Sequence, residues 1–248
     1  MTNPDAKVLR AVSFIVPAWN EERILGSTLE TLFAAAKALN MPFEVIVADD
    51  GSTDGTARVA QERGARVVRV QHRQIAATRN AGARAATGDL FVFVDADTWV
   101  TPEVLRAALE AVRRGAVGGG CTVKFEGPLP FYARVLLPGL IWLYRAAKLA
   151  GGCFLFATRE AFERVGGFDE TLFASEECIL SRALGRCGRF VVLREPVITS
   201  GRKLRTYSGW EVLRILAGLA RASRRTNRSS KGMEIWYGPR RADPEQGS

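Results

Sequence analysis

Two aspartates separated by one small residue, Asp95 and Asp97, have the residue type and spacing for metal chemistry. They directly follow the apolar run 90–94, which fits a strand buried on both faces of a parallel sheet. Open α/β sheets bind ligands at the carboxyl ends of their strands, where Mg²⁺ or Mn²⁺ can share carboxylate and phosphate oxygens. The pattern therefore fits a metal held against a diphosphate. Taken alone, it fits a strand ending in a polar turn equally well.

Other acids and cations recur at the ends of predicted elements. Asp49 and Asp50 end a second predicted strand, residues 43–48. After the first predicted strand, residues 11–16, Asn20 would cap a helix reaching residue 39, an alternative to a binding role. Further along the chain, the acidic pair Glu176 and Glu177 begins a predicted helix that reaches residue 187. The cations Arg202 and Lys203 follow the last predicted strand. The acids also suit a helix N-terminus, and the cations could either stabilise a departing diphosphate or form a solvated face.

Strands and helices alternate four times over the first 115 residues, which predicts a mostly parallel, doubly wound α/β sheet flanked by helices. Dinucleotide-binding oxidoreductases share this alternation. They carry Gly-x-Gly-x-x-Gly after the first strand, and this sequence has no such motif there. That class is therefore disfavoured.

Composition excludes several other classes. The chain has 248 residues and 47% apolar content, enough for a full core. Its four cysteines are scattered without a Cys-x-x-Cys, and His72 is the one histidine, so zinc hydrolysis and Ser-His-Asp chemistry are disfavoured. Residues 1–10 lack the apolar core of a signal peptide, which predicts a cytoplasmic location.

Positive charge is concentrated near the C-terminus. Of the net charge of +9, residues 202–231 contribute nine basic residues against one acid, Glu211. This segment predicts an anionic partner, which could be a diphosphate, a phospholipid surface or nucleic acid. Nucleic acid is disfavoured because the segment lacks interleaved aromatic residues and a DNA-binding motif. A lipid-linked acceptor or an anionic membrane surface is preferred.

Residues 129–149 are strongly apolar but interrupted by Arg134, Arg145 and Lys148. The longest uncharged run, residues 135–144, is too short for an ordinary membrane span. The stretch predicts either a core helix or an amphipathic helix lying on a surface, and core packing is favoured.

Four blocks together resemble the family 2 nucleotide-sugar glycosyltransferases with the GT-A fold. They are Pro17–Glu22, Asp49–Asp54, Thr78–Gly82 and Asp95–Asp97, in the order and approximate spacing of that family. The resemblance covers residues 11–115 and continues more weakly to residue 205. It implies an inverting transfer of sugar from a nucleoside-diphosphate sugar to an acceptor hydroxyl.

The resemblance also implies roles for individual residues. Asp50 would meet the base, with Asp49 supporting it, and Arg79 would lie near the diphosphate. Asp97 would ligate Mg²⁺ or Mn²⁺, with Asp95 near the ribose and as a second candidate ligand. The other candidate nucleotide-sugar-binding residues are Pro17, Ala18, Asn20, Glu22, Ala96, Arg202 and Lys203.

In this family an acidic pair supplying the catalytic base follows Gly-Gly-Phe-Asp-Glu, which here is Gly166–Glu170. The resemblance thus places the base at Glu176 or Glu177, with Glu177 favoured. Two features depart from the family: the second acid is Glu where Asp is commoner, and Ile179 stands at a position that is often acidic. The Gln-x-x-Arg-Trp signature of processive synthases is missing, which predicts transfer of a single sugar.

The sequence therefore predicts one GT-A domain, residues 1–205, with a nucleotide-binding half (11–115) and an acceptor half (116–205). Residues 206–248 would form a helical basic extension, and the protein would lie in the cytoplasm, peripherally at the inner face of the membrane. Two alternatives are a sugar-phosphate nucleotidyltransferase and a non-catalytic nucleotide- or membrane-binding module. The first normally carries a glycine-rich loop with Arg and Lys after the first strand, which is missing here.

Overall fold

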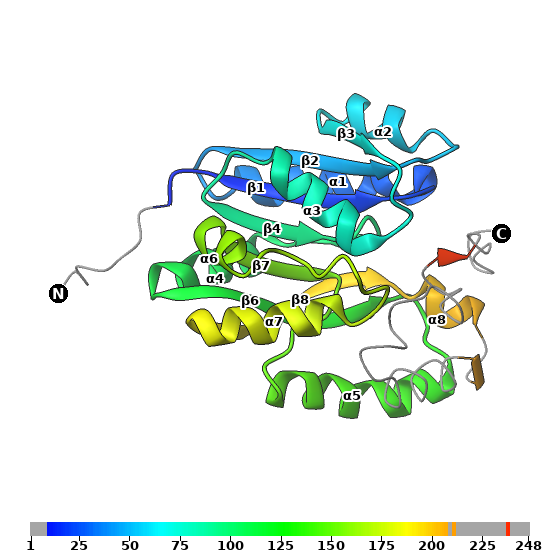
Figure 1. Cartoon of the computed structure of the whole chain (residues 1–248). Helices are drawn as coiled ribbons and strands as arrows, with labels where there is room; N and C mark the ends of the chain where they lie inside the picture. The colour runs from blue at the N-terminus through cyan, green and yellow to red at the C-terminus, as the bar shows by residue number, and fades with distance from the viewer. Residues whose placement is uncertain (1–8, 208–209, 212–236, 239–248) are drawn as a thin grey trace.

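The computed structural model describes residues 9–207, 210–211 and 237–238. Its centre is an eight-stranded sheet with strand order β3-β2-β1-β4-β7-β6-β8-β5 (Figure 1). The strands are β1 (Val12–Ala18), β2 (Phe43–Asp50), β3 (Arg66–Val70), β4 (Leu90–Val94), β5 (Thr98–Trp99), β6 (Ala116–Glu126), β7 (Phe154–Thr158) and β8 (Arg189–Ser200). The helices are α1 (Glu22–Lys37), α2 (Thr56–Glu62), α3 (Ile75–Ala85), α4 (Pro102–Arg113), α5 (Phe131–Ala146), α6 (Arg159–Arg164), α7 (Glu176–Cys187) and α8 (Arg202–Thr206).

The first four long strands form the parallel part of the sheet. β1 pairs in parallel with β2 and β4, and β2 pairs in parallel with β3. The carboxyl ends of β1, β2 and β4 therefore lie at one edge, which brings the chain near Ala18, Asp50 and Asp95 together. This confirms the α/β fold predicted from the apolar runs.

The second part of the sheet is mixed. β7 runs antiparallel to β4 and β6, and β5 runs antiparallel to β8, while β6 and β8 are parallel. Residues 189–196, the first two thirds of β8, were missed in the sequence because charged residues and Pro196 interrupt their apolar pattern. A register irregularity between Cys121 and Thr122 of β6 accommodates that stretch.

Helices cover both faces of the sheet. α1 and α4 pack on one face through Leu25, Leu29 and Val104. α3, α6 and α7 pack on the other, which faces the viewer in Figure 1. The small residues of α3 let it lie close to β1: a Cβ added at Gly82 would come within 2.5 Å of the Ile15 side chain.

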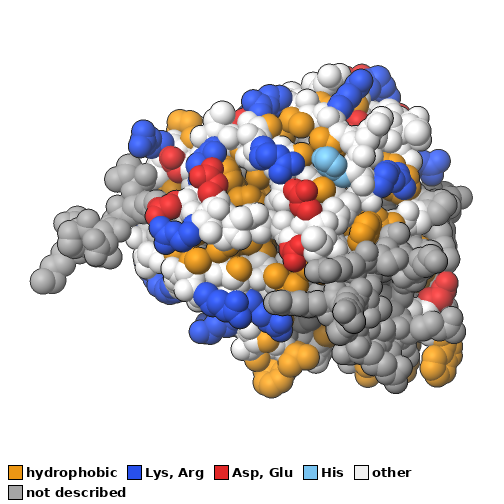
Figure 2. All heavy atoms as spheres, viewed as in Figure 1, with side chains coloured by type: hydrophobic (Ala, Val, Ile, Leu, Met, Phe, Trp, Pro, Cys, Tyr) orange, Lys and Arg blue, Asp and Glu red, His pale blue; other side chains and the backbone are white. Residues whose placement is uncertain are grey.

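Two local predictions were wrong. Asn20 does not cap α1, which begins at Glu22. The backbone of Asn20 has a positive φ of 51°, and its side-chain oxygen accepts a hydrogen bond from Thr53 N at 2.9 Å. α5 is not a core helix, because Phe131 is 81% exposed and Trp142 is 70% exposed. Figure 2 shows apolar side chains gathered at the lower edge of the molecule, where Figure 1 places α5.

Most of the helical basic extension predicted for residues 206–248, and with it most of the basic segment 202–231, lies outside the described residues. Within the part of the chain that the structure does describe, no helix has both the length and the apolar content needed to cross a bilayer.

Candidate active site

A cavity of about 420 Å³ opens at the carboxyl edge of the parallel strands. Asp50 from the end of β2, Asp97 after β4 and Glu177 from α7 all line this one cavity. The same wall also contains Pro17, Ala18, Arg79, Asp95, Ala96, Glu176 and Lys203. The structure thus brings ten of the fourteen candidate residues to one place, although they are spread over 187 residues of sequence.

Arg79 is buried at the base of this cavity and joins three carboxylates. Its Nη2 donates to Asp95 Oδ1 at 2.9 Å, and its Nη1 donates to Glu176 Oε1 at 3.1 Å and to Glu177 Oε1 at 3.2 Å. Nη2 also donates to the carbonyl oxygen of Gly152 at 2.9 Å. Both terminal nitrogens of the guanidinium are therefore occupied by protein acceptors.

Burial disfavours a charged arginine, but the three carboxylates outweigh this and raise the pKa of Arg79. The guanidinium therefore stays charged. Its Nε is buried without a hydrogen-bond partner. Nη1 and Nη2 therefore make all of the hydrogen bonds that the Arg79 side chain forms with the described residues.

Glu176 and Glu177 share Arg79 but differ in exposure. The Glu176 side chain is 4% exposed and that of Glu177 is 18% exposed. Burial, followed by the neighbouring charge of Glu177, raises the pKa of Glu176 to about 8. Glu177 is the carboxylate of the pair that a ligand in the cavity can reach more easily.

Asp95 and Asp97 form the predicted metal-ligating pair. Asp97 is buried, and its negative charge, together with the dominant effect of burial, raises the pKa of Asp95. The two acids are hard oxygen donors on the cavity wall. No cluster of three or more His, Cys, Asp or Glu that could hold a metal occurs within the described ranges. The pair therefore fits a hard divalent cation that takes its other ligands from phosphate and water, as Mg²⁺ and Mn²⁺ do.

Asp50 holds the loop that leads into α3. Its carboxylate accepts hydrogen bonds from the backbone N–H groups of His72, Arg73 and Gln74, at 2.6, 2.9 and 3.1 Å. It also accepts one from the Thr78 hydroxyl at 2.9 Å. One carboxylate at the end of β2 thereby fixes the first turn of the helix that carries Arg79.

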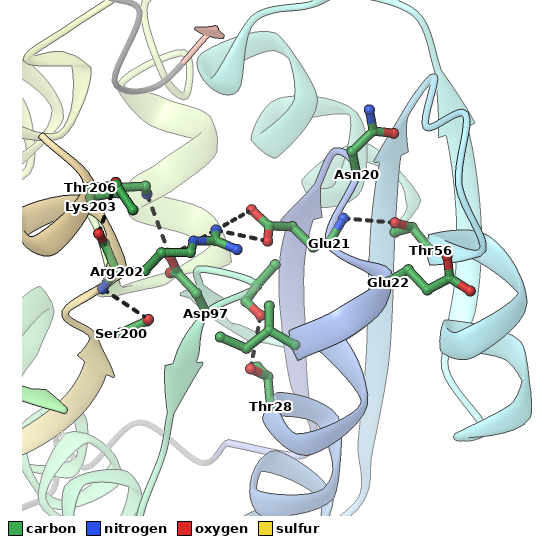
Figure 3. Close-up of polar contacts among 12 residues, drawn as sticks. Asn20, Glu21, Glu22, Thr28, Thr56, Asp97, Ser200, Arg202, Lys203 and Thr206 are labelled. Carbon is green, nitrogen blue, oxygen red and sulfur yellow. Dashed lines mark hydrogen bonds and ion pairs between the residues drawn. The ribbon is translucent and has the colours of Figure 1, made fainter. Parts of the chain in front are cut away.

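Two cations of α8 point toward Glu21 and Asp97 (Figure 3). Lys203 Nζ lies 3.5 Å from Asp97 Oδ2, and Arg202 Nη2 lies 4.0 Å from the same oxygen. Arg202 Nη2 also donates to both carboxylate oxygens of the buried Glu21, at 3.0 and 3.2 Å. Glu21 is thus joined to α8, whereas Glu22 points away from it (Figure 3).

Four candidate residues do not line the cavity: Asn20, Glu22, Asp49 and Arg202. Asn20 and Glu22 instead hold the loop before α2, where Glu22 Oε2 accepts from Gly55 N at 3.0 Å. Asp49 Oδ1 accepts from Ser52 N at 3.2 Å. In this arrangement these side chains support the strand ends that form the cavity.

A family model decides what kind of protein this is. The model described as glycosyl transferase family 2 matches residues 13–166, more than half of the chain. The chain belongs to glycosyl transferase family 2.

Curated proteins also match this family 2 chain. It is 32% identical to a dolichol-phosphate mannosyltransferase of Pyrococcus furiosus over 149 residues, which are 55% of this chain and 41% of that protein. It is 34% identical to an undecaprenyl-phosphate 4-deoxy-4-formamido-L-arabinose transferase of Edwardsiella ictaluri over 172 residues, which are 63% of this chain and 51% of that protein. The chain spans about half the length of these curated relatives.

Solved structures show the same fold. A mannosyltransferase of Pyrobaculum calidifontis, solved with GDP-Man and Mn²⁺, superposes with a TM-score of 0.66 at 20% identity, over 94% of this chain and 69% of that one. S. aureus TarS, solved with UDP-GlcNAc, gives a TM-score of 0.59 at 20% identity, over 77% and 58% of the two chains. The GT-A fold is thereby confirmed.

Several residues at the site of this family 2 protein were missed in the sequence. Glu21 was treated as a helix-start acid, yet it forms the buried pair with Arg202. Gly152 was not noticed, although a Cβ there would collide with Glu177 Oε1. Tyr237 also lines the cavity, and its hydroxyl donates to Phe173 O at 3.0 Å. Only the charge of Glu21 offered any signal, because the other two act through contacts far apart in sequence.

The raised pKa of Glu176 predicts how stability depends on pH. In the folded protein the pKa of Glu176 is raised to about 8, so the side chain keeps its proton to higher pH than in the unfolded chain, where the ordinary pKa of 4.5 applies. The contribution of this group is therefore complete below about pH 4.5 and is lost as pH rises toward 8. We expect Glu176→Gln, which mimics the protonated acid, to lose less stability over this range than the wild type. Urea unfolding of both proteins between pH 5 and pH 8 measures the difference, and parallel curves would contradict the assignment.

Proposed function

We propose that this protein transfers a single sugar from a nucleoside-diphosphate sugar to an acceptor hydroxyl, with inversion at the anomeric carbon. The observation that carries the proposal is that Asp50, Asp97 and Glu177 line one cavity at the carboxyl edge of the sheet. Family membership supports it, as do the nucleotide sugars bound in two structures with the same fold.

In this mechanism Glu177 acts as general base. It accepts the proton of the acceptor hydroxyl, whose oxygen attacks the anomeric carbon while the bond from that carbon to the diphosphate oxygen breaks. The leaving diphosphate gains negative charge, which Lys203 and Arg202 are placed to offset from α8. Mg²⁺ or Mn²⁺ held by Asp95 and Asp97 would supply further stabilisation of that charge.

The two halves of the chain would divide the work. Residues 11–115 supply Asp50, Asp95 and Asp97 and would hold the nucleotide sugar. Residues 116–205 supply Glu177 and Lys203 and would hold the acceptor. The single domain 1–205 would then be completed by the basic extension 206–248.

The names of the relatives favour a second class of acceptor, a lipid-linked phosphate. Their names give dolichol phosphate and undecaprenyl phosphate, in which the nucleophile would be a phosphate oxygen. A phosphate oxygen is already anionic near pH 7 and needs no general base. Glu177 therefore separates the two acceptor classes.

Replacing Glu177 by Gln keeps the shape of the side chain and removes the base. For a hydroxyl acceptor we expect kcat to fall by about 10²–10⁴-fold with unchanged affinity for the nucleoside diphosphate. For a polyprenyl-phosphate acceptor we expect transfer to survive. Transfer of radiolabelled sugar from UDP- and GDP-sugars to each acceptor class measures this.

Glu62→Gln is the matched control, because Glu62 is exposed and pairs with Arg58 away from the cavity. Full hydroxyl transfer by Glu177→Gln would remove Glu177 from its role. A wild type that binds nucleotide and transfers no sugar would favour the non-catalytic binding module. Release of pyrophosphate from a sugar phosphate and a nucleoside triphosphate would favour the nucleotidyltransferase.

The exposed face of α5 supports a location on an anionic membrane surface. Phe131, Val135, Leu136, Trp142 and Leu143 are all exposed, by 43–81%. The helix and the two residues after it carry three exposed cations and no acid: Arg134, Arg145 and Lys148. Apolar side chains flanked by cations are the combination that binds the interface of anionic bilayers. We place the protein at the cytoplasmic face of a membrane, where a lipid-linked acceptor would meet the cavity.

Removing the apolar anchors should weaken that binding. We expect Phe131→Ser and Trp142→Ser each to reduce the binding to anionic phospholipid vesicles by about tenfold. Each substitution removes a large apolar side chain that would be buried in the bilayer interface. Ile198→Ser is the control, because Ile198 is an exposed apolar residue on β8, outside α5. Flotation at low salt measures binding. Wild-type protein that stays unbound at low salt would contradict the location.

A further inference from the structure

The closest described cation to Asp97 is a lysine on a flexible stem. Lys203 Nζ lies 3.5 Å from Asp97 Oδ2, and the side chain of Asp97 is only 6% exposed (Figure 3). A nearby cation stabilises a buried carboxylate, and Lys203 is nearer to Asp97 than Arg202, whose Nη2 lies 4.0 Å from the same oxygen and donates to Glu21. Lys203 also lines the cavity, so its ammonium can reach a ligand bound there.

Lys203 and a divalent cation would compete for Oδ2 of Asp97. A metal would bind that oxygen at about 2.1 Å, and an ammonium beside it would repel the metal in a buried site. Metal binding at this oxygen is therefore opposed until the ammonium moves away.

The backbone around Lys203 is held while its side chain is free to turn. Arg202 is fixed by its two hydrogen bonds to Glu21, at 3.0 and 3.2 Å, and its backbone N–H donates to Ser200 Oγ at 3.2 Å. A lysine side chain is a flexible four-carbon stem, so its ammonium can leave Asp97 by rotation about the side-chain bonds, without any movement of α8. When a nucleoside diphosphate occupies the cavity, its phosphates would offer the Lys203 ammonium a new anionic partner.

We propose that Lys203 is the resident counter-ion of Asp97 and couples metal binding to nucleotide binding. It neutralises Asp97 when no metal is bound, and it transfers to the diphosphate when metal and nucleotide bind together. The metal alone then binds weakly, because it must displace the ammonium from Asp97 while no diphosphate is present to receive it. With a nucleoside diphosphate present the displaced ammonium gains a partner, so each ligand strengthens the binding of the other. This inference rests on the proposed function, since it takes Asp97 as a metal ligand.

Mn²⁺ affinity of the full chain tests the inference independently of sugar transfer. Free Mn²⁺ is measured by electron paramagnetic resonance, first with metal alone and then with saturating UDP or GDP. We expect Lys203→Met to bind Mn²⁺ alone about tenfold more tightly than the wild type, because one opposing charge is removed. We expect the same variant to bind UDP or GDP more weakly at saturating Mn²⁺. A purely structural role for Lys203 would not move the two affinities in opposite directions.

Three further variants make the result decisive. Lys124→Met is the control, because Lys124 is exposed on β6 between Val123 and Phe125, which line the cavity while Lys124 does not. Lys203→Arg should restore the weak binding of metal alone, since it keeps the charge. If Lys203→Met proves unstable by thermal unfolding, Lys203→Gln replaces it.

Asp97→Asn separates this inference from the proposed function. If that variant loses Mn²⁺ binding and Lys203→Met does not gain it, the counter-ion role is overturned and the metal site stands. If Asp97→Asn binds Mn²⁺ as tightly as the wild type, the metal site at Asp97 is wrong and the counter-ion role falls with it.

Discussion

The site depends on one buried cation. Arg79 is fully enclosed, and its guanidinium is shared by Asp95, Glu176 and Glu177. Removing an arginine from such a cluster leaves buried carboxylates without a counter-charge, which typically costs about 3–5 kcal/mol. A lysine would not replace it, because an ammonium lacks the planar fork that reaches several acceptors at once. The cavity therefore keeps its shape only while this guanidinium is in place.

The same cation joins the two halves of the chain. Arg79 belongs to α3 and Asp95 follows β4, both within the first 115 residues. Glu176 and Glu177 begin α7, and Gly152 lies in the loop before β7, both in the second half. The carbonyl of Gly152 accepts from Arg79, and the missing Cβ of Gly152 leaves room for Glu177. A candidate metal ligand and the proposed base are thus set relative to one another by a single side chain.

The strands and the motif blocks could be predicted because their signals are local. Apolar runs located β1, β2 and β4 closely, and the four blocks identified the family. The contacts of the site could not be predicted in this way. Arg79 meets Glu176 across 97 residues, and Arg202 meets Glu21 across 181 residues, so no local pattern reports either pair. Asn20 was read as a cap because a cap needs only its own neighbours, whereas its partner, Thr53, comes from another loop.

The position of α5 was missed for a related reason. Its apolar residues predict burial, but nothing local says whether a partner element covers them.

The central claim concerns a contact that can be measured: Arg79 serves sugar transfer by holding Glu177. A double-mutant cycle on kcat with Arg79→Lys and Glu177→Gln tests it, after circular dichroism has shown that each variant is folded. The account predicts that Arg79→Lys slows the Glu177→Gln enzyme much less than it slows the wild type, because part of the effect of the arginine passes through the base. Losses that multiply independently would contradict it, and would place the action of Arg79 on the substrate instead.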